Sequence, residues 1–157
     1  VLTGMNQNKV VWYAEGIRTA IDVSQKYPSA NVKSRQFVIG GYRAQLRVQA
    51  QRDGIKVWLG AFFDLCPHPD DDFVQWPFVT PFTLSFVHPT DASKDISHEV
   101  MREDITERFL SAVQKPKGKC AGKWIGFPQI QTVSDMEKAG FRLDDGLTVA
   151  VTLHSTS

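Results

Sequence analysis

Metal chemistry would fall most naturally on Cys66-Pro67-His68, which three aspartates follow at positions 70–72. Thiolate and imidazole ligands suit zinc, but a zinc site needs about four ligands at recognisable spacing. No second cysteine or histidine pair stands near this stretch, and the aspartates lack the Asp/Asn-Gly-Glu layout of a calcium loop. Because two prolines and three acids suit neither a helix nor a strand, we expect a polar loop and no metal site.

The residues that commonly catalyse reactions show no recognisable arrangement. The four histidines are scattered along the chain. The sequence contains neither a Gly-x-Ser-x-Gly nucleophile elbow nor a cysteine-protease signature, and no glycine-rich nucleotide-binding motif is present. We therefore expect a protein that is not an enzyme, with no catalytic residues and no cofactor.

A run of basic residues, Lys115, Lys117, Lys119 and Lys123, stands beside Trp124. Lysines next to an aromatic ring can hold a nucleic-acid backbone and stack a base. The net charge of the chain is only +1, so there is no overall field that would attract nucleic acid or an anionic membrane. We expect these lysines to be solvated and predict no nucleic-acid partner.

Composition is that of a globular protein, with 42% hydrophobic and 22% charged residues. No hydrophobic run approaches the roughly 18 residues of a membrane span, so we expect no membrane insertion. The two cysteines, Cys66 and Cys120, are too few for the disulfide framework of a small secreted domain. We interpret them as reduced thiols in a cytoplasmic protein, and a single disulfide is the alternative.

Alternation of hydrophobic and polar residues predicts the elements that carry these side chains. It is clearest from Tyr42 to Gln51, where one face is apolar and the other carries arginine and glutamine. Further strands are expected at 9–13, 20–23, 35–39, 57–65, 82–87 and 147–154, and one short helix at 134–140. This pattern predicts an all-β fold, an antiparallel β-sandwich formed by residues 8–154. Residues 1–7 are expected to be a flexible edge or a remnant of cloning, and residues 155–157 a frayed tail.

Four segments in order make the chain similar to a MATH domain of the TRAF type, the C-terminal domain of tumour-necrosis-factor-receptor-associated factors. The segments are Val10–Tyr13, Gly41–Val48, Gln75–Phe78 with the strand that follows it, and Trp124–Ile130 with Gly140–Leu147. Trp76-Pro77-Phe78 is the most specific, since this tripeptide separates the TRAF type from other MATH domains. The resemblance implies an eight-stranded antiparallel β-sandwich, agreeing with the strand pattern. It also implies a cytoplasmic signalling adaptor that binds short extended peptides of receptors or adaptors along a sheet edge and across a shallow groove.

The resemblance, carried over residue by residue, places seven residues in this groove: Arg47, Gln49, Asp53, Phe62, Val113, Ile125 and Phe127. Arg47 matches the family arginine that contacts an acidic or aromatic side chain of the peptide. Phe62 is expected to be partly exposed beside it, on the strand face opposite Phe63. The alternatives are a solvated strand arginine and a core-facing phenylalanine. Because Gln49, Val113 and Ile125 replace the usual aromatic residues, a standard receptor motif is expected to bind weakly or not at all.

Two further functions compete with this one. The first is a MATH domain that recruits substrates to a cullin-type ubiquitin ligase, against which the Trp-Pro-Phe segment argues. The second is a structural or oligomerisation domain with a degenerate groove. The resemblance also implies a homotrimer in the full-length protein, assembled mainly through a coiled coil before the domain.

Overall fold

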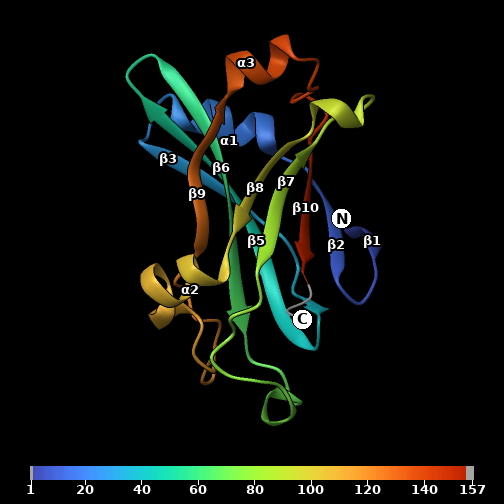
Figure 1. Ribbon diagram of the computed structural model, residues 1–157. Coiled ribbons are helices and arrows are strands. Elements are labelled where there is room, and N and C mark those ends of the chain that lie inside the picture. Colours follow the sequence, from blue (N-terminus) through green and yellow to red (C-terminus); the bar gives the residue numbers. More distant parts are fainter. Residues whose placement is uncertain (1, 155–157) are drawn as a thin grey trace.

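Ten strands form two antiparallel sheets within residues 2–154, the part of the chain that the computed structural model describes. The two sheets pack face to face (Figure 1). A continuous hydrophobic core lies between them. The predicted antiparallel β-sandwich is therefore confirmed, with ten strands in place of eight. The tail predicted at 155–157 lies outside the described residues.

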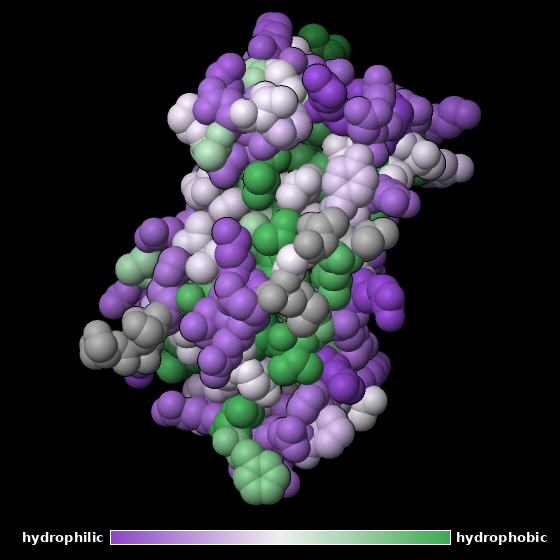
Figure 2. All heavy atoms as spheres, turned by 90° about the vertical axis from the view of Figure 1, so that its right-hand side faces the viewer, coloured by the Kyte–Doolittle hydropathy of each residue, from purple (hydrophilic) through white to green (hydrophobic). Residues whose placement is uncertain are grey.

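The first sheet has the strand order β1-β2-β10-β7-β8. Its strands are β1 (Leu2–Met5), β2 (Lys9–Ala14), β10 (Leu147–Leu153), β7 (Phe82–Val87) and β8 (Ile96–Val100). β1 pairs with β2, so most of the segment expected to be a flexible edge is a strand of the sheet. On the side of the molecule that β1 and β2 occupy, hydrophobic residues form a band bordered by polar ones (Figure 2).

The second sheet has the order β3-β5-β6-β9, and β4 also pairs with β5. Its strands are β3 (Ser29–Lys33), β4 (Phe37–Ile39), β5 (Tyr42–Asp53), β6 (Lys56–Cys66) and β9 (Ile125–Thr132). β5 and β6 form a long hairpin in register from Asp53 opposite Lys56 to Arg43 opposite Cys66. The turn between them contains Gly54 at a φ of 64°, a left-handed conformation that favours glycine.

The alternation in β5 sorts its side chains between the core and the outer face. Tyr42, Ala44, Leu46, Val48 and Ala50 are buried in the core. Their polar neighbours point away from it and are half-buried. Because paired residues in an antiparallel ladder share a face, this register decides which β6 residues join the outer face.

Residues 2–154 contain three α-helices rather than the single one expected: α1 (Ile17–Ser24), α2 (Arg102–Arg108) and α3 (Val133–Lys138). The strand predicted at 20–23 is wrong, since these residues belong to α1. Ile17, Ala20, Ile21 and Ser24 are all buried, and their spacing places them on one helix face. Three short 3-10 turns complete the chain: η1 (Asp71–Phe73), η2 (Ala92–Lys94) and η3 (Leu110–Ala112).

The predicted helix at 134–140 corresponds to α3, which begins at Val133 and ends at Lys138. Thr132 precedes the helix, and its hydroxyl accepts a hydrogen bond from the Asp135 N–H at 3.1 Å. Gly140, at a φ of 97°, follows the helix in the left-handed conformation common after helix ends. No helix among the described residues is long and apolar enough to cross a membrane.

Candidate functional site

A row of residues crosses the outer face of the second sheet and contains the strongest candidate, Arg47. Lys33 on β3 pairs with Arg47 on β5, Arg47 pairs with Phe62 on β6, and Phe62 pairs with Gly126 on β9. Neighbouring strands lie about 4.8 Å apart, so these four positions are successive steps across the sheet. We call them the Arg47 row.

Two aromatic rings enclose the guanidinium of Arg47. Its central carbon lies 4.3 Å from the ring centroid of Phe62 and 4.9 Å from that of Trp124. Both distances allow cation–π attraction. One terminal nitrogen donates to the Asn31 side-chain oxygen at 3.1 Å, whereas the buried Nε has no hydrogen-bond partner among the described residues. Burial lowers the pKa of Arg47, and the nearby carboxylate of Asp64 opposes this shift.

Phe62 corrects the expectation of partial exposure. It lies on the face opposite Phe63, as predicted, because Phe63 packs in the core and Phe62 does not. Its exposed fraction is nevertheless only 8%. The Arg47 guanidinium covers its ring, so Phe62 forms the floor beneath a cation and is neither a core residue nor an open pocket wall.

Trp124 belongs to this cluster and was not among the predicted site residues. It stands immediately before β9, and the Lys33 ammonium lies 5.6 Å from its ring centroid. An aromatic residue next to a lysine run was the available signal. That signal was weighed only as nucleic-acid binding and interpreted as solvated lysines, since the sequence does not show that Trp124 lies against Arg47.

The other candidates on the hairpin lie further along it. Gln49 shares the outer face, is half-buried and pairs with Gly60. Asp53 is exposed at the end of β5, six positions beyond Arg47. Six residues of strand span about 20 Å, so Asp53 and Arg47 do not share one pocket.

Three predicted pocket residues face inward. The side chains of Val113 and Ile125 are fully buried in the core, with no exposed surface to offer a peptide. Phe127 is half-buried on the same inner face, since it pairs with the core residue Ala61. Its ring lies 5.0 Å from that of His98 on β8, which places it between the two sheets at their margin. These three residues do not join the Arg47 row.

β9 is an edge strand. Among the described residues it pairs with β6 and with no strand on its other side. Pro128 lies within β9, as is usual only for edge strands and bulges. At Gly126 a Cβ would lie 2.1 Å from the Ala61 carbonyl oxygen, so the close approach of β9 to β6 requires glycine there. The Arg47 row therefore ends at an open edge without a side chain.

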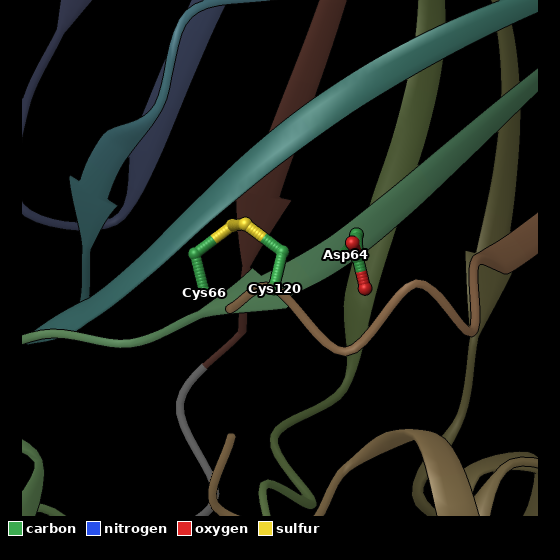
Figure 3. A group of neighbouring side chains, drawn as sticks. All are labelled: Asp64, Cys66 and Cys120. Atoms are coloured by element: carbon green, nitrogen blue, oxygen red, sulfur yellow. A yellow bond between two sulfur atoms is a disulfide. The ribbon is translucent and has the colours of Figure 1, made fainter. Parts of the chain in front are cut away.

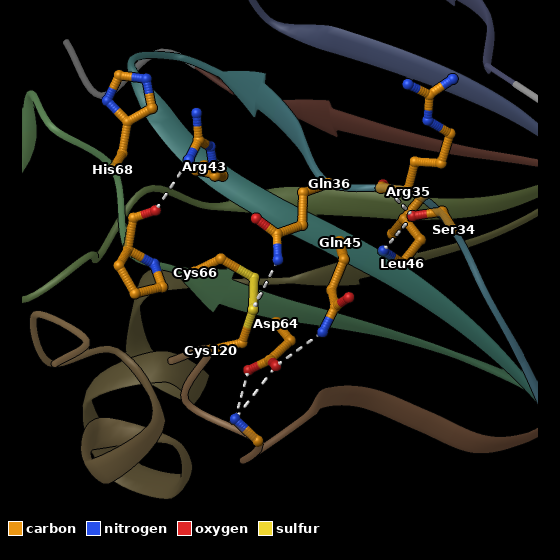
Figure 4. Close-up of a disulfide and its surroundings, with 12 residues drawn as sticks. Ser34, Arg35, Gln36, Arg43, Gln45, Leu46, Asp64, Cys66, His68 and Cys120 are labelled. Carbon is orange, nitrogen blue, oxygen red and sulfur yellow. Dashed lines mark hydrogen bonds between the residues drawn. A yellow bond between two sulfur atoms is a disulfide. The ribbon is translucent and has the colours of Figure 1, made fainter. Parts of the chain in front are cut away.

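Cys66 and Cys120 form a disulfide, which corrects the expectation of two reduced thiols (Figures 3 and 4). The pairing of β6 with β9 brings the chain before Ile125 back along the end of β6, where Cys66 lies. Asp64 lies beside the disulfide. One of its carboxylate oxygens and the sulfurs of Cys66 and Cys120 lie within 4.8 Å of one another. Since the bond uses both sulfurs, this group offers no thiolate to a metal.

Asp64 connects this region to β5. Its two carboxylate oxygens accept the Gly122 N–H at 3.1 Å, and one also accepts from the Gln45 amide at 3.4 Å (Figure 4). Burial raises the pKa of Asp64, and the hydrogen bonds from Gly122 and Gln45 act in the opposite direction. Arg43, further along β5, donates to the Pro67 carbonyl. The polar side of β5 is thus engaged in contacts within the domain.

The loop with His68 is a local turn. The His68 N–H donates to the Asp71 carboxylate at 2.9 Å, and His68 Nδ1 accepts the Asp70 N–H at 3.0 Å. Lys115 forms an ion pair with Asp72. A cavity of about 860 Å³ lies elsewhere, between α1, α3 and the β5–β6 turn, and none of the seven candidates lines it.

Comparison with known proteins agrees with this architecture. Residues 29–150 match the family model described as TRAF/meprin, MATH domain. Among solved structures, the chain is similar to Notothenia coriiceps TRAF5, with a TM-score of 0.77 and 22% sequence identity. This similarity covers 97% of the chain and 75% of the TRAF5 chain, and at this identity it shows the fold. A search of curated proteins found no match.

Proposed function

Because the chain belongs to the TRAF/meprin MATH-domain family, we propose that it binds short extended peptides of receptors or adaptors along the β9 edge, beside the Arg47 row. MATH domains are protein-interaction modules and not enzymes. Beyond this family role, we propose the ligand, a short extended peptide, and the surface, the β9 edge. In such binding, the peptide adds a strand to a sheet edge, while pockets on the sheet face select its side chains.

The register supports this location. A peptide strand paired with β9 would be the next step of the Arg47 row, beyond Gly126. Gly126 has no side chain, so a peptide side chain at this step can extend over it toward Phe62 and Trp124. Gln49 lies on the same face next to this path. Val113 and Ile125 are not part of the proposed surface, because both are sealed in the core.

The observation that carries the proposal is the incompletely paired guanidinium of Arg47, on the strand β5, which only β6 separates from the edge strand β9. Its Nε is buried without a partner among the described residues, and a buried donor without a partner is unfavourable. Lys33 adds a second positive charge nearby. A peptide carboxylate would pair with these cations through charge-assisted hydrogen bonds, so we infer a preference for an acidic residue at this step.

A peptide array tests the proposal. The array presents Pro-x-Glu and Pro-x-Gln motifs and scrambled versions of each to the 157-residue chain. We expect selective retention of acidic motifs, and loss of that retention in Arg47→Ala but not in Gln51→Ala, a variant further along the same face. Equal retention of motifs and scrambled peptides would exclude the proposed specificity.

The adaptor role, a link to the ubiquitin pathway and a trimer in the full-length protein are proposals that rest on the resemblance to TRAF-type domains. A coiled coil before the domain in the full-length protein would support them. A BTB domain after it would support substrate recruitment to a cullin-type ligase. A chain that trimerises yet retains no peptide would support the structural role.

The proposed cytoplasmic location loses one of its arguments, since Cys66 and Cys120 are not reduced. Stable disulfides are typical of oxidising compartments, and those in the cytosol are usually transient, catalytic or redox-sensing. Fractionation of cells that express the tagged full-length protein tests the location. In a cytoplasmic protein, this disulfide would belong to the redox-sensing class.

A further inference from the structure

We propose that the Cys66–Cys120 disulfide is a thiol–disulfide exchange site, and that its reduction by a dithiol releases residues 117–124 from the outer face of the sheet. This segment carries Trp124, the second ring over Arg47. The disulfide would thus control whether the Arg47 row is covered from above. Only this last consequence for peptide binding rests on the proposed function.

Few contacts besides the disulfide hold the segment. The Ala121 N–H donates to the Leu65 carbonyl at 2.9 Å, and the Gly122 N–H donates to the Asp64 carboxylate at 3.1 Å. The Gln36 amide donates to the Cys120 sulfur at 3.4 Å. Trp124 stacks on Arg47 and Lys33. Local opening has a low free energy where few apolar contacts are buried and the backbone hydrogen bonds are exposed.

The composition of the segment also favours opening. Gly118 and Gly122 adopt φ values of 77° and 69°, and the segment carries three exposed lysines: Lys117, Lys119 and Lys123. Its two ends are anchored, since Pro116 and Ile125 are both buried. The segment therefore resembles a short loop fixed at its ends and held down in the middle by one covalent bond.

The two cysteines differ in exposure, which favours one direction of exchange. Cys120 is half-buried, whereas Cys66 is 1% exposed. A dithiol's thiolate attacks the sulfur of the more exposed Cys120, forms a mixed disulfide and expels Cys66 as a thiolate, which takes up a proton. The dithiol's second thiolate then attacks the dithiol's first sulfur, which is bonded to Cys120 in the mixed disulfide, and releases Cys120. The dithiol loses two electrons and two protons, and the protein gains both as two thiols.

Trypsin provides the test, because three of its target residues lie on the segment. The 157-residue chain is digested with and without dithiothreitol, and cleavage after Lys117, Lys119 and Lys123 is followed by mass spectrometry. Reduction should raise cleavage at these sites at least about tenfold, since proteolysis follows the population of the open form. Lys94 is exposed and lies in η2, between β7 and β8 of the first sheet. Cleavage after Lys94 should not change. Cys120→Ser should be cleaved at the faster rate with or without dithiothreitol.

Each other result would overturn the proposal. Equal cleavage of the segment in both states would show that the disulfide does not hold it down. Faster cleavage at Lys94 as well would show that reduction unfolds the domain as a whole. Iodoacetamide labelling of two thiols before reduction would show that the bond is absent. Peptide affinity is measured separately, so a chain that opens on reduction but binds no peptide would contradict the proposed function and leave the exchange site standing.

Discussion

Arg47 shows how far a single position can be interpreted from sequence. The alternation in β5 places it on the outer face, and the resemblance assigns it a ligand contact. Neither reveals that Phe62 and Trp124 enclose it, because that depends on a strand pairing and on a segment 77 positions away (124 − 47). The expectation that Phe62 is partly exposed is wrong for the same reason.

Arg47→Ala should affect both binding and folding. We expect peptide affinity to fall by about 1.5–3 kcal/mol, the range for charge-assisted hydrogen bonds. The free energy of unfolding should fall by about 1–3 kcal/mol, since two cation–π contacts are lost and the ring of Phe62 is uncovered. Titration calorimetry and urea unfolding measure the two effects. Gln51→Ala, on the same face, should change stability by no more than about 0.5 kcal/mol, and an equally small change for Arg47→Ala would contradict the enclosed geometry.

The buried carboxyl group of Asp64 is expected to make the stability of the domain depend on pH. Burial raises its pKa in the folded state above the value in the unfolded chain. The folded state therefore holds this proton more tightly, so the Asp64 contribution to stability is fully present below the unfolded pKa and is lost as pH rises through the folded one. We expect wild type to gain stability relative to Asp64→Asn as pH falls from 7 toward about 4, near the ordinary carboxyl range. Urea unfolding at each pH measures the difference in unfolding free energy between the two proteins. If wild type instead loses stability relative to Asp64→Asn as pH falls, the folded state favours the ionised carboxylate.

At the scale of elements, β9 is the strand on which the proposed function depends. If a peptide pairs with its open edge, alternate peptide amides donate to β9 and the intervening ones point away. N-methylation at the donating positions should weaken binding by at least about 0.5–1.5 kcal/mol per lost hydrogen bond. Methylation at the intervening positions serves as the control. Calorimetry that shows no alternation along the peptide would exclude strand addition at this edge.

Some of these elements could be predicted from the sequence and others could not. The long hairpin and β7 and β10 were predictable, because strict alternation over many residues has one interpretation. The helix α1 was missed, since 20–23 is too short a window to distinguish a strand from a helix. The full spacing of Ile17, Ala20, Ile21 and Ser24 indicates the helix. The disulfide was only the alternative in the sequence, because the pairing of β6 with β9, which brings Cys120 to Cys66, is a tertiary contact.

Across the whole molecule, the disulfide closes a large loop that leaves the second sheet at the end of β6, passes through the first sheet and returns just before β9. Cys66 and Cys120 are 54 positions apart in sequence, and the loop between them contains β7, β8 and α2. A cross-link of this span restricts the unfolded chain, and the loop-entropy relation gives a stabilisation of about 4 kcal/mol as an upper expectation. The double variant Cys66→Ser, Cys120→Ser should therefore lose about 2–4 kcal/mol of unfolding free energy. Wild type in dithiothreitol should lose a similar amount, whereas the double variant should not respond to dithiothreitol. Guanidinium unfolding measures all three, and a wild type whose unfolding midpoint is the same with and without dithiothreitol would show that the cross-link does not restrict the unfolded chain.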